Sequence, residues 1–163
     1  MTGTGHRLTG IGAAFIAAAL LRMAGATEVE QLVGAVIAGS TPRIPDWIEI
    51  STFRNGVRTG TVIPHRTITH WPPLWLFIAW YAHGFGGLIA AGGVGVTVGA
   101  LTHILGDAPN PMGIPWIFPH KRIVFGKKGW WRSGKNEAWI VMGYGLFGVW
   151  LWGYSARFAG GAT

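Results

Sequence analysis

Six side chains of the kinds that bind metals lie near the ends of apolar stretches of this sequence. They are His6, Asp46, His65, His70, His103 and Asp107. Imidazole and carboxylate groups bind zinc and other divalent ions, and the chain has no cysteine that could supply a thiolate. Ionisable groups at the ends of membrane spans often mark function. The pattern predicts a hard or borderline metal at a membrane surface, with metal-assisted hydrolysis as its chemistry.

The spacing within two segments supports one shared site. His103 and Asp107 are four residues apart, which places them on one face of a helix. A histidine hydrogen-bonded inside a bundle and an aspartate that caps the next segment would give the same spacing. His65 and His70 are five residues apart, which suits a turn leading into a helix. The alternative for this second pair is a polar interfacial loop before a span.

Carboxylates and one arginine are candidates for the catalytic groups. Asp46 follows Pro45, which predicts a rigid turn, and Glu49 lies three residues further on. A cap on a short helix is the alternative role for Asp46. Asp46, Glu49 or Asp107 would serve as the general base, and the spacing does not choose among them. Arg66 or Thr69 is the candidate for orienting a phosphate or a ligand.

Membrane helices are the elements predicted to position these groups. Half of the 163 residues are hydrophobic and 12% are charged, against about 25% in ordinary soluble domains. The chain also has 27 glycines and ten tryptophans, and both residue types are common in membrane proteins. The composition therefore favours a membrane protein.

Uncharged stretches locate the spans. Residues 67–106 contain no Lys, Arg, Asp or Glu, and these 40 residues are enough for a helical hairpin that breaks at the glycines near 83–87. Further spans are predicted at 8–24 and 138–156, with a short or tilted one at 31–42. The prediction is an all-α, multi-pass bundle of about five membrane segments, with residues 1–163 forming one membrane-embedded domain.

The distribution of charge predicts the orientation. With five spans, the N-terminal tip, the 41–70 loop and the basic 107–136 loop share one side, which carries 11 of the 13 Lys and Arg residues. The positive-inside rule makes this side cytoplasmic. The same side carries all six candidate ligands, so we expect a site on the cytoplasmic face of a bacterial inner membrane. Topology accounts for most of the net charge of +7, so nucleic acid is not expected as a partner.

The chain resembles the YdjM/DUF457 family, whose members are regarded as membrane-bound, metal-dependent hydrolases. The resemblance covers most of the chain. It rests on Gly5-His6, Pro45-Asp46, His65-Arg66-x-x-Thr69-His70, His103-Ile104-Leu105-x-Asp107, and the stretch from Asn110 to Pro115 with Pro119. The family is thought to be distantly similar to helical zinc-dependent phospholipases C and single-strand nucleases. By this resemblance, the six candidate ligands would bind metal.

The sequence departs from the family pattern at one motif. Where the family usually reads Pro-Asp-x-Asp-His, this chain has Ile48 and Glu49 in place of the second aspartate and the histidine. Glutamate can replace histidine as a ligand, whereas isoleucine cannot replace aspartate. One metal site is therefore expected to be altered or lost. Glu137 fits the glutamate that the family has near its last helix, and we expect it to support the ligands indirectly.

Three functions remain open from the sequence. The first is a hydrolase that uses zinc, or manganese as the alternative, to cleave a phospholipid-like phosphoester at the bilayer surface. The second is a non-catalytic membrane protein with a structural or vestigial metal site, acting through partners. Gly95 and Gly99 form a GxxxG pattern suited to packing within the bundle or between copies in an oligomer or larger assembly. A channel is disfavoured because the spans lack ionisable groups away from their ends.

Overall fold

The structure is a computed structural model that describes residues 1–49, 51–63, 66–126 and 134–158. Most of the described chain is helical. The α-helices are α1 (Gly3–Met23), α2 (Glu28–Ser40), α3 (Ile44–Trp47), α4 (Pro72–His83), α5 (Gly87–Asp107) and α6 (Glu137–Ser155). Two short 3-10 helices, η1 (Ile68–His70) and η2 (Ala156–Phe158), adjoin α4 and α6. The strands are β1 (Ser51–Arg54), β2 (Val57–Thr61), β3 (Ile114–Pro115) and β4 (Arg122–Ile123).

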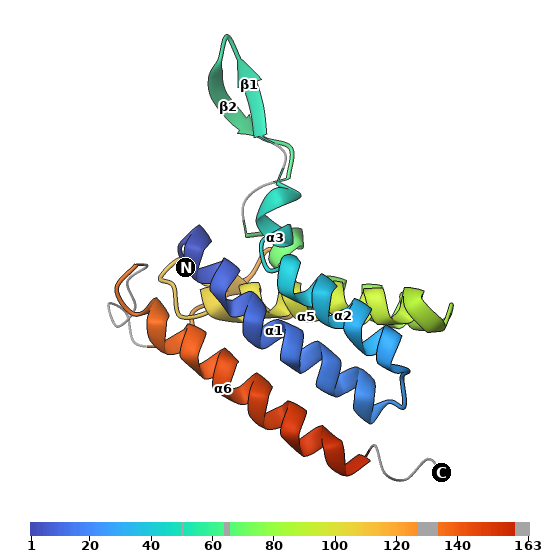
Figure 1. Cartoon of the computed structure of the whole chain (residues 1–163). Helices are drawn as coiled ribbons and strands as arrows, with labels where there is room; N and C mark the ends of the chain where they lie inside the picture. The colour runs from blue at the N-terminus through green and yellow to red at the C-terminus, as the bar shows by residue number, and fades with distance from the viewer. Residues whose placement is uncertain (50, 64–65, 127–133, 159–163) are drawn as a thin grey trace.

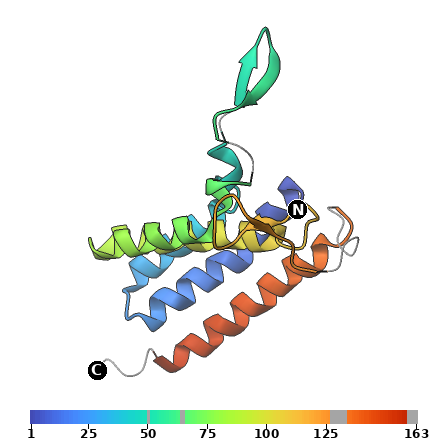
Figure 2. The same ribbon diagram turned by 180° about the vertical axis from the view of Figure 1, so that it is seen from behind.

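The long helices form a bundle in which α1 is central. Helix α1 packs against α6, α2 and α5, while α4 packs against α5 (Figures 1 and 2). Because successive helices run in opposite directions, α1, α4 and α6 begin at the end of the bundle where α2 and α5 finish. All candidate ligands among the described residues belong to the segments at this end, which we call the site end.

Small residues let α2 and α5 approach closely. A Cβ atom on Gly95 would lie 2.6 Å from the backbone oxygen of Gly34, and one on Gly99 would lie 3.0 Å from that of Ala38. Such distances are too short for a real Cβ atom, so this backbone approach needs glycine. The GxxxG pattern is therefore used for packing inside the chain, the first of the two uses expected from the sequence.

The outer surface of the bundle is apolar. Large side chains exposed on the helices include Ile11, Leu32, Phe77, Trp80, Leu146 and Trp150. A soluble protein rarely exposes so much apolar side-chain surface, whereas lipid tails cover such a surface in a membrane. The buried residues between the helices are mainly glycine and alanine, together with Trp75, Ile104 and Ile114.

All five predicted membrane segments fall on helices, but these helices differ in length. In the described part of the chain, α1 and α5 are long and apolar enough to cross a membrane. Helices α2 and α4 have 13 and 12 residues, which corresponds to about 20 Å and about 18 Å of rise, against a hydrocarbon core of about 30 Å. Five complete spans therefore remain a prediction.

The prediction of an all-α protein is wrong for two segments. Strands β1 and β2 form an antiparallel hairpin that projects from the site end (Figure 1). Its turn is Asn55-Gly56, with φ of 52° and 75°, and Asn-Gly is the strongest short-range signal for such a turn. Strands β3 and β4 pair within the basic loop 107–136. The sequence interpretation followed hydrophobic stretches and so passed over both pairs of strands.

Candidate metal centre

The helix termini place the histidines. His6 lies in the second turn of α1, a helix that begins at an N-cap hydrogen bond in which the Gly5 amide donates to Thr2 Oγ1, at 3.2 Å. His103 and Asp107 lie on one face of the last turn of α5, as their spacing predicts. All three side chains are almost fully buried. A helix beginning and a helix end thus meet at one point.

Two short elements bring the remaining ligands to this point. Helix α3 holds Asp46 and begins with a proline in its first turn, at Pro45. The 3-10 turn η1 carries His70 and is held by a hydrogen bond of 2.8 Å from Trp75 Nε1 to the Thr69 carbonyl. His70 is fully buried. The structure therefore joins groups from α1, α3, η1 and α5, which lie far apart in the sequence.

Three donor atoms converge in a triangle. His70 Nε2 lies 3.1 Å from His103 Nε2, and Asp46 Oδ1 lies 3.5 Å and 3.3 Å from these two nitrogens. Donors placed tetrahedrally around zinc at about 2.0–2.1 Å are about 3.3–3.4 Å from one another. The triangle therefore has the dimensions of one face of a zinc coordination tetrahedron. Two imidazoles and one carboxylate also match the ligand set of many catalytic zinc sites.

His70 is oriented by groups on its other nitrogen. Thr69 Oγ1 lies 3.1 Å from His70 Nδ1, and Glu49 Oε1 lies 3.8 Å from the same atom. With the proton on Nδ1, the ring donates to Thr69 and keeps the Nε2 lone pair directed at the triangle. Metal-binding histidines usually have such a partner on the second nitrogen. Glu49 is therefore placed to orient His70 and not to act as a ligand in the triangle.

A second group of potential ligands adjoins the first. His6, His103 and Asp107 have ligand atoms within 4.8 Å of one another, so His103 belongs to both groups. His6 Nε2 lies 3.4 Å from Asp107 Oδ1, and the rings of His6 and His103 stack with centroids 3.8 Å apart. The Asp107 carboxylate also accepts hydrogen bonds from Arg66 and from the α-amino group of Met1.

We call the five side chains of the two groups, together with Arg66, the site cluster. Its members are His6, Asp46, Arg66, His70, His103 and Asp107. In the described residues, six buried side-chain nitrogen or oxygen atoms have no hydrogen-bond partner, and five of them belong to this cluster. Buried polar atoms rarely lack partners in native proteins, and an ion or ligand is a common reason. The donor distances and these atoms together fit a bound divalent metal.

The charge state of Asp46 also suits a metal ligand. Burial works to raise the pKa of this carboxyl, but the His103 and His70 rings beside it outweigh burial and hold the pKa well below its usual range. Asp46 is therefore a carboxylate at neutral pH. Metals bind the ionised form of an acid and the neutral form of an imidazole, so this arrangement needs little proton release from Asp46.

The structure places most of the residues singled out in the sequence at one point. It brings together His6, Asp46, His70, His103 and Asp107, with Arg66 beside Asp107 and Glu49 beside His70. His65 lies outside the described residues. Ile48, at the departure from the family pattern, is 41% exposed, and its hydrocarbon side chain has no atom that could bind a metal. Thr69, which the sequence offers beside Arg66 for orienting a phosphate or a ligand, lies next to His70 Nδ1.

Glu137 contacts the segment that carries His6, which is the indirect support expected from the sequence. Its carboxylate accepts hydrogen bonds from the Thr2 amide, from Thr2 Oγ1 at 2.6 Å and from the Gly134 amide at 2.8 Å. These contacts join the beginning of α6 to the beginning of α1. Glu137 therefore supports the segment that carries His6 rather than contacting a ligand directly.

Comparison with known proteins agrees with this architecture. Searches of curated proteins and of solved structures found no match. The family model described as YdjM inner membrane protein matches residues 1–159, which is nearly the whole chain. The apolar outer surface and the two candidate spans are those of a membrane protein. The chain belongs to the YdjM inner membrane protein family.

Proposed function

We propose that this protein is a metal-dependent hydrolase that cleaves a phosphoester at the cytoplasmic surface of the inner membrane. The observation that carries the proposal is the triangle formed by His70, His103 and Asp46. Its three donors are spaced for one divalent ion, zinc first and manganese as the alternative. When bound, such an ion supplies Lewis-acid activation of water and of a phosphoryl oxygen.

Arg66 is suited to hold the phosphate. Its side chain is 4% exposed, and one nitrogen, Nη2, donates to Asp107. The other two guanidinium nitrogens, Nε and Nη1, are buried without a hydrogen-bond partner among the described residues. Either nitrogen can donate to a phosphate oxygen while Nη2 stays on Asp107, and hydrogen bonds from a guanidinium to phosphate are strong because both groups are charged. The residue also has a left-handed backbone, with φ of 56°, which ordinary side chains rarely adopt.

Each of the three carboxylates in or beside the site cluster has a different role in this proposal. Asp46 completes the ligand triangle, and Asp107 holds Arg66 in place while also lying near His6. Glu49 lies beside His70 and is the carboxylate left to accept a proton from water, since Asp46 is a member of the triangle and Asp107 is held by Arg66. This assignment keeps Asp46, Glu49 and Arg66 as the groups closest to the reaction.

The position of the cluster suggests a substrate at the membrane surface. The cluster lies at the site end, which also carries most of the Lys and Arg residues of the described chain, including Arg7, Arg43 and Lys121. The positive-inside rule would orient this end toward the cytoplasm. An amphiphilic phosphoester with its headgroup at that depth would reach the cluster without leaving the bilayer, as a phospholipid does.

A non-catalytic protein with a structural metal is the second candidate. It is favoured by Ile48, which supplies no ligand where the family pattern has aspartate, and by Asp107, whose charge is already balanced by Arg66 and the Met1 amine. Such a protein would keep the triangle as a cross-link between α3, η1 and α5 and would act through protein partners. It would bind the metal but would not turn over a substrate.

Metal content and turnover separate the two candidates. Detergent-purified protein, loaded with zinc or manganese, would be assayed by mass spectrometry and by hydrolysis of p-nitrophenyl phosphodiesters and short-chain phospholipids. We expect His103→Ala to lose metal and activity, and Arg66→Gln to keep metal but lose activity. His83→Ala is the matched control, because His83 is exposed at the opposite end of the bundle. Metal without turnover on any substrate would favour the structural role, and no metal would refute both.

A further inference from the structure

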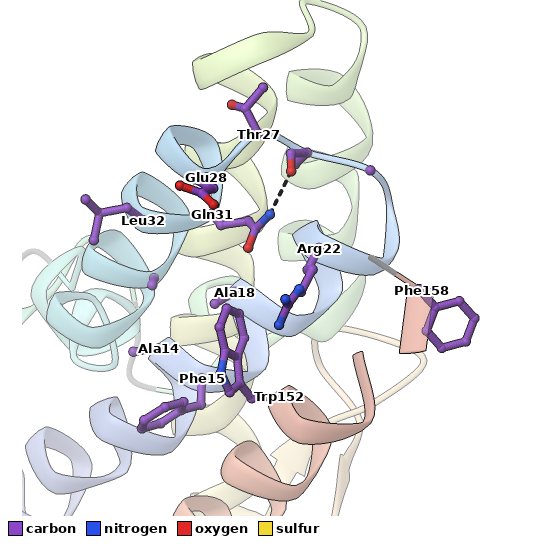
Figure 3. Close-up of a pocket in the computed structure, with 13 residues that line it drawn as sticks. Ala14, Phe15, Ala18, Arg22, Thr27, Glu28, Gln31, Leu32, Trp152 and Phe158 are labelled. Atoms are coloured by element: carbon purple, nitrogen blue, oxygen red, sulfur yellow. Dashed lines mark hydrogen bonds between the residues drawn. The ribbon is translucent and has the colours of Figure 1, made fainter. Parts of the chain in front are cut away.

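A cavity lies at the end of the bundle opposite the site cluster. It has a volume of about 730 Å³ and lies between α1, α2 and the last turns of α6 (Figure 3). The residues that form most of its wall are small or apolar: Ala14, Phe15, Ala18, Leu32, Ala35 and Trp152. Its volume is within the range of about 300–1,000 Å³ that is typical of ligand sites. We call it the Arg22 cavity.

One cation lies within the wall of this cavity. Arg22 is in the last turn of α1, and its guanidinium carbon lies 4.8 Å from the centroid of the Trp152 ring, toward which Figure 3 shows it pointing. Glu28 also lines the cavity, but no ion pair joins Arg22 to a carboxylate in the described part of the chain. The cavity wall therefore carries one cation, whose contact is an aromatic face, and one carboxylate that is not paired with it.

The topology of the chain does not require this charge. Eleven of the 13 Lys and Arg residues belong to the segments predicted on the cytoplasmic side, and Arg22 and Arg157 are the other two. The positive-inside rule disfavours cations on the opposite side. Arg157 lies over the Tyr154 ring and does not line the cavity. An arginine kept at this end and directed into an apolar cavity is best explained by an anionic ligand.

We propose that the Arg22 cavity binds one anionic phospholipid. Its phosphate would contact Arg22 at the mouth, since guanidinium groups bind phosphate through two parallel hydrogen bonds. One acyl chain would lie along the alanine-lined wall formed by Ala14, Ala18 and Ala35. The Gln31 side chain is already held by a hydrogen bond of 2.7 Å from its Nε2 to the Ala26 carbonyl, so the wall is ordered before the lipid binds.

The test compares two lipids that differ in charge. Full-length protein in a neutral detergent would be titrated with dioleoyl phosphatidylglycerol and, separately, with dioleoyl phosphatidylcholine, and bound lipid would be counted by native mass spectrometry. We expect at least tenfold tighter binding of the anionic lipid. Arg22→Gln should weaken binding of the anionic lipid at least tenfold, because the charge and its hydrogen bonds to phosphate are lost, and leave the zwitterionic lipid unchanged.

Two further variants separate the cavity from general surface charge. Arg157→Gln removes the same charge from the same end outside the cavity and should bind the anionic lipid as the wild type does. Ala35→Leu fills the wall without changing charge and should weaken binding. Circular dichroism and thermal unfolding in detergent, measured on each variant, verify folding. Equal binding of both lipids, equal loss in Arg157→Gln, or unaltered binding in Ala35→Leu would overturn the proposal.

Discussion

His70 and His103 face each other through their Nε2 atoms at 3.1 Å, although 33 residues separate them in the chain. Two imidazoles with their lone pairs directed at one point repel unless a proton or a cation lies between them. Asp46 Oδ1 completes the triangle and supplies negative charge at the same point. This relationship between the end of α5 and the turn before α4 is the basis of the predictions for the metal centre.

His103 should matter more than His6 for metal binding. His103 belongs to both groups of potential ligands, whereas His6 belongs to one. We expect His103→Ala to abolish metal retention during dialysis and His6→Ala to leave at least part of it. Metal content by mass spectrometry measures this difference. Equal metal loss in the two variants would contradict the central position of His103.

Thr69 should tune the affinity for metal without being a ligand. Its hydroxyl lies 3.1 Å from His70 Nδ1, and loss of such a partner typically weakens metal affinity by about 10–100-fold. Thr69→Val keeps the shape and removes the acceptor. Thr59→Val, on the exposed strand β2, is the matched control. Competition with a fluorescent zinc chelator measures the zinc affinity of both variants. The same affinity in Thr69→Val as in the wild type would rule out an orienting role for Thr69.

Asp46 should make the stability of the metal-free protein depend on pH in acid. Its pKa in the folded protein lies below its usual value, so its stabilising contribution is fully present above the unfolded-state pKa of about 3.9. That contribution is lost as the pH falls through the folded-state value. We expect Asp46→Asn to be less stable than the wild type at pH 6 and to lose less stability on acidification. An equal decrease in melting temperature on acidification for the two proteins would contradict this prediction.

Gly95 should tolerate no side chain. Gly95→Ala places a Cβ atom 2.6 Å from the Gly34 carbonyl oxygen, so α2 and α5 must separate. The expected loss is about 1–3 kcal/mol in the free energy of unfolding. Gly143→Ala is the control, because a Cβ atom there has no neighbour within 4 Å and gains up to about 1 kcal/mol of helix propensity. The free energy of unfolding, measured by denaturation in detergent, should therefore decrease in Gly95→Ala and increase in Gly143→Ala.

The positions of the helices and the convergence of the ligands could be predicted because charged and polar residues are scarce in this chain. Each one that interrupts an apolar stretch marks a helix end, so His6, His103 and Asp107 could be assigned to one side of the membrane from the sequence. The turn between α4 and α5 falls at Gly84–Gly86, within the break that the glycines predict.

Contacts between distant side chains could not be predicted in the same way. The hydrogen bonds from Arg66 and the Met1 amine to Asp107 depend on how a loop folds over the helix ends, and neither has a local sequence signal. The same applies to the contact of Glu137 with Thr2, which depends on the packing of α6 against α1. The β1–β2 hairpin is different, since its Asn-Gly turn was visible in the sequence.

The shared imidazole of His103 means that the two groups of ligands cannot be filled independently. An ion bound by His70, Asp46 and His103 would occupy His103 Nε2, the same atom that lies 3.9 Å from Asp107 Oδ2 of the second group. The first ion must therefore lower the affinity for a second, and thermodynamic linkage requires the second to lower the affinity for the first by the same factor. Titration with metal should accordingly show that one ion binds with high affinity and that a second binds only at a much higher metal concentration.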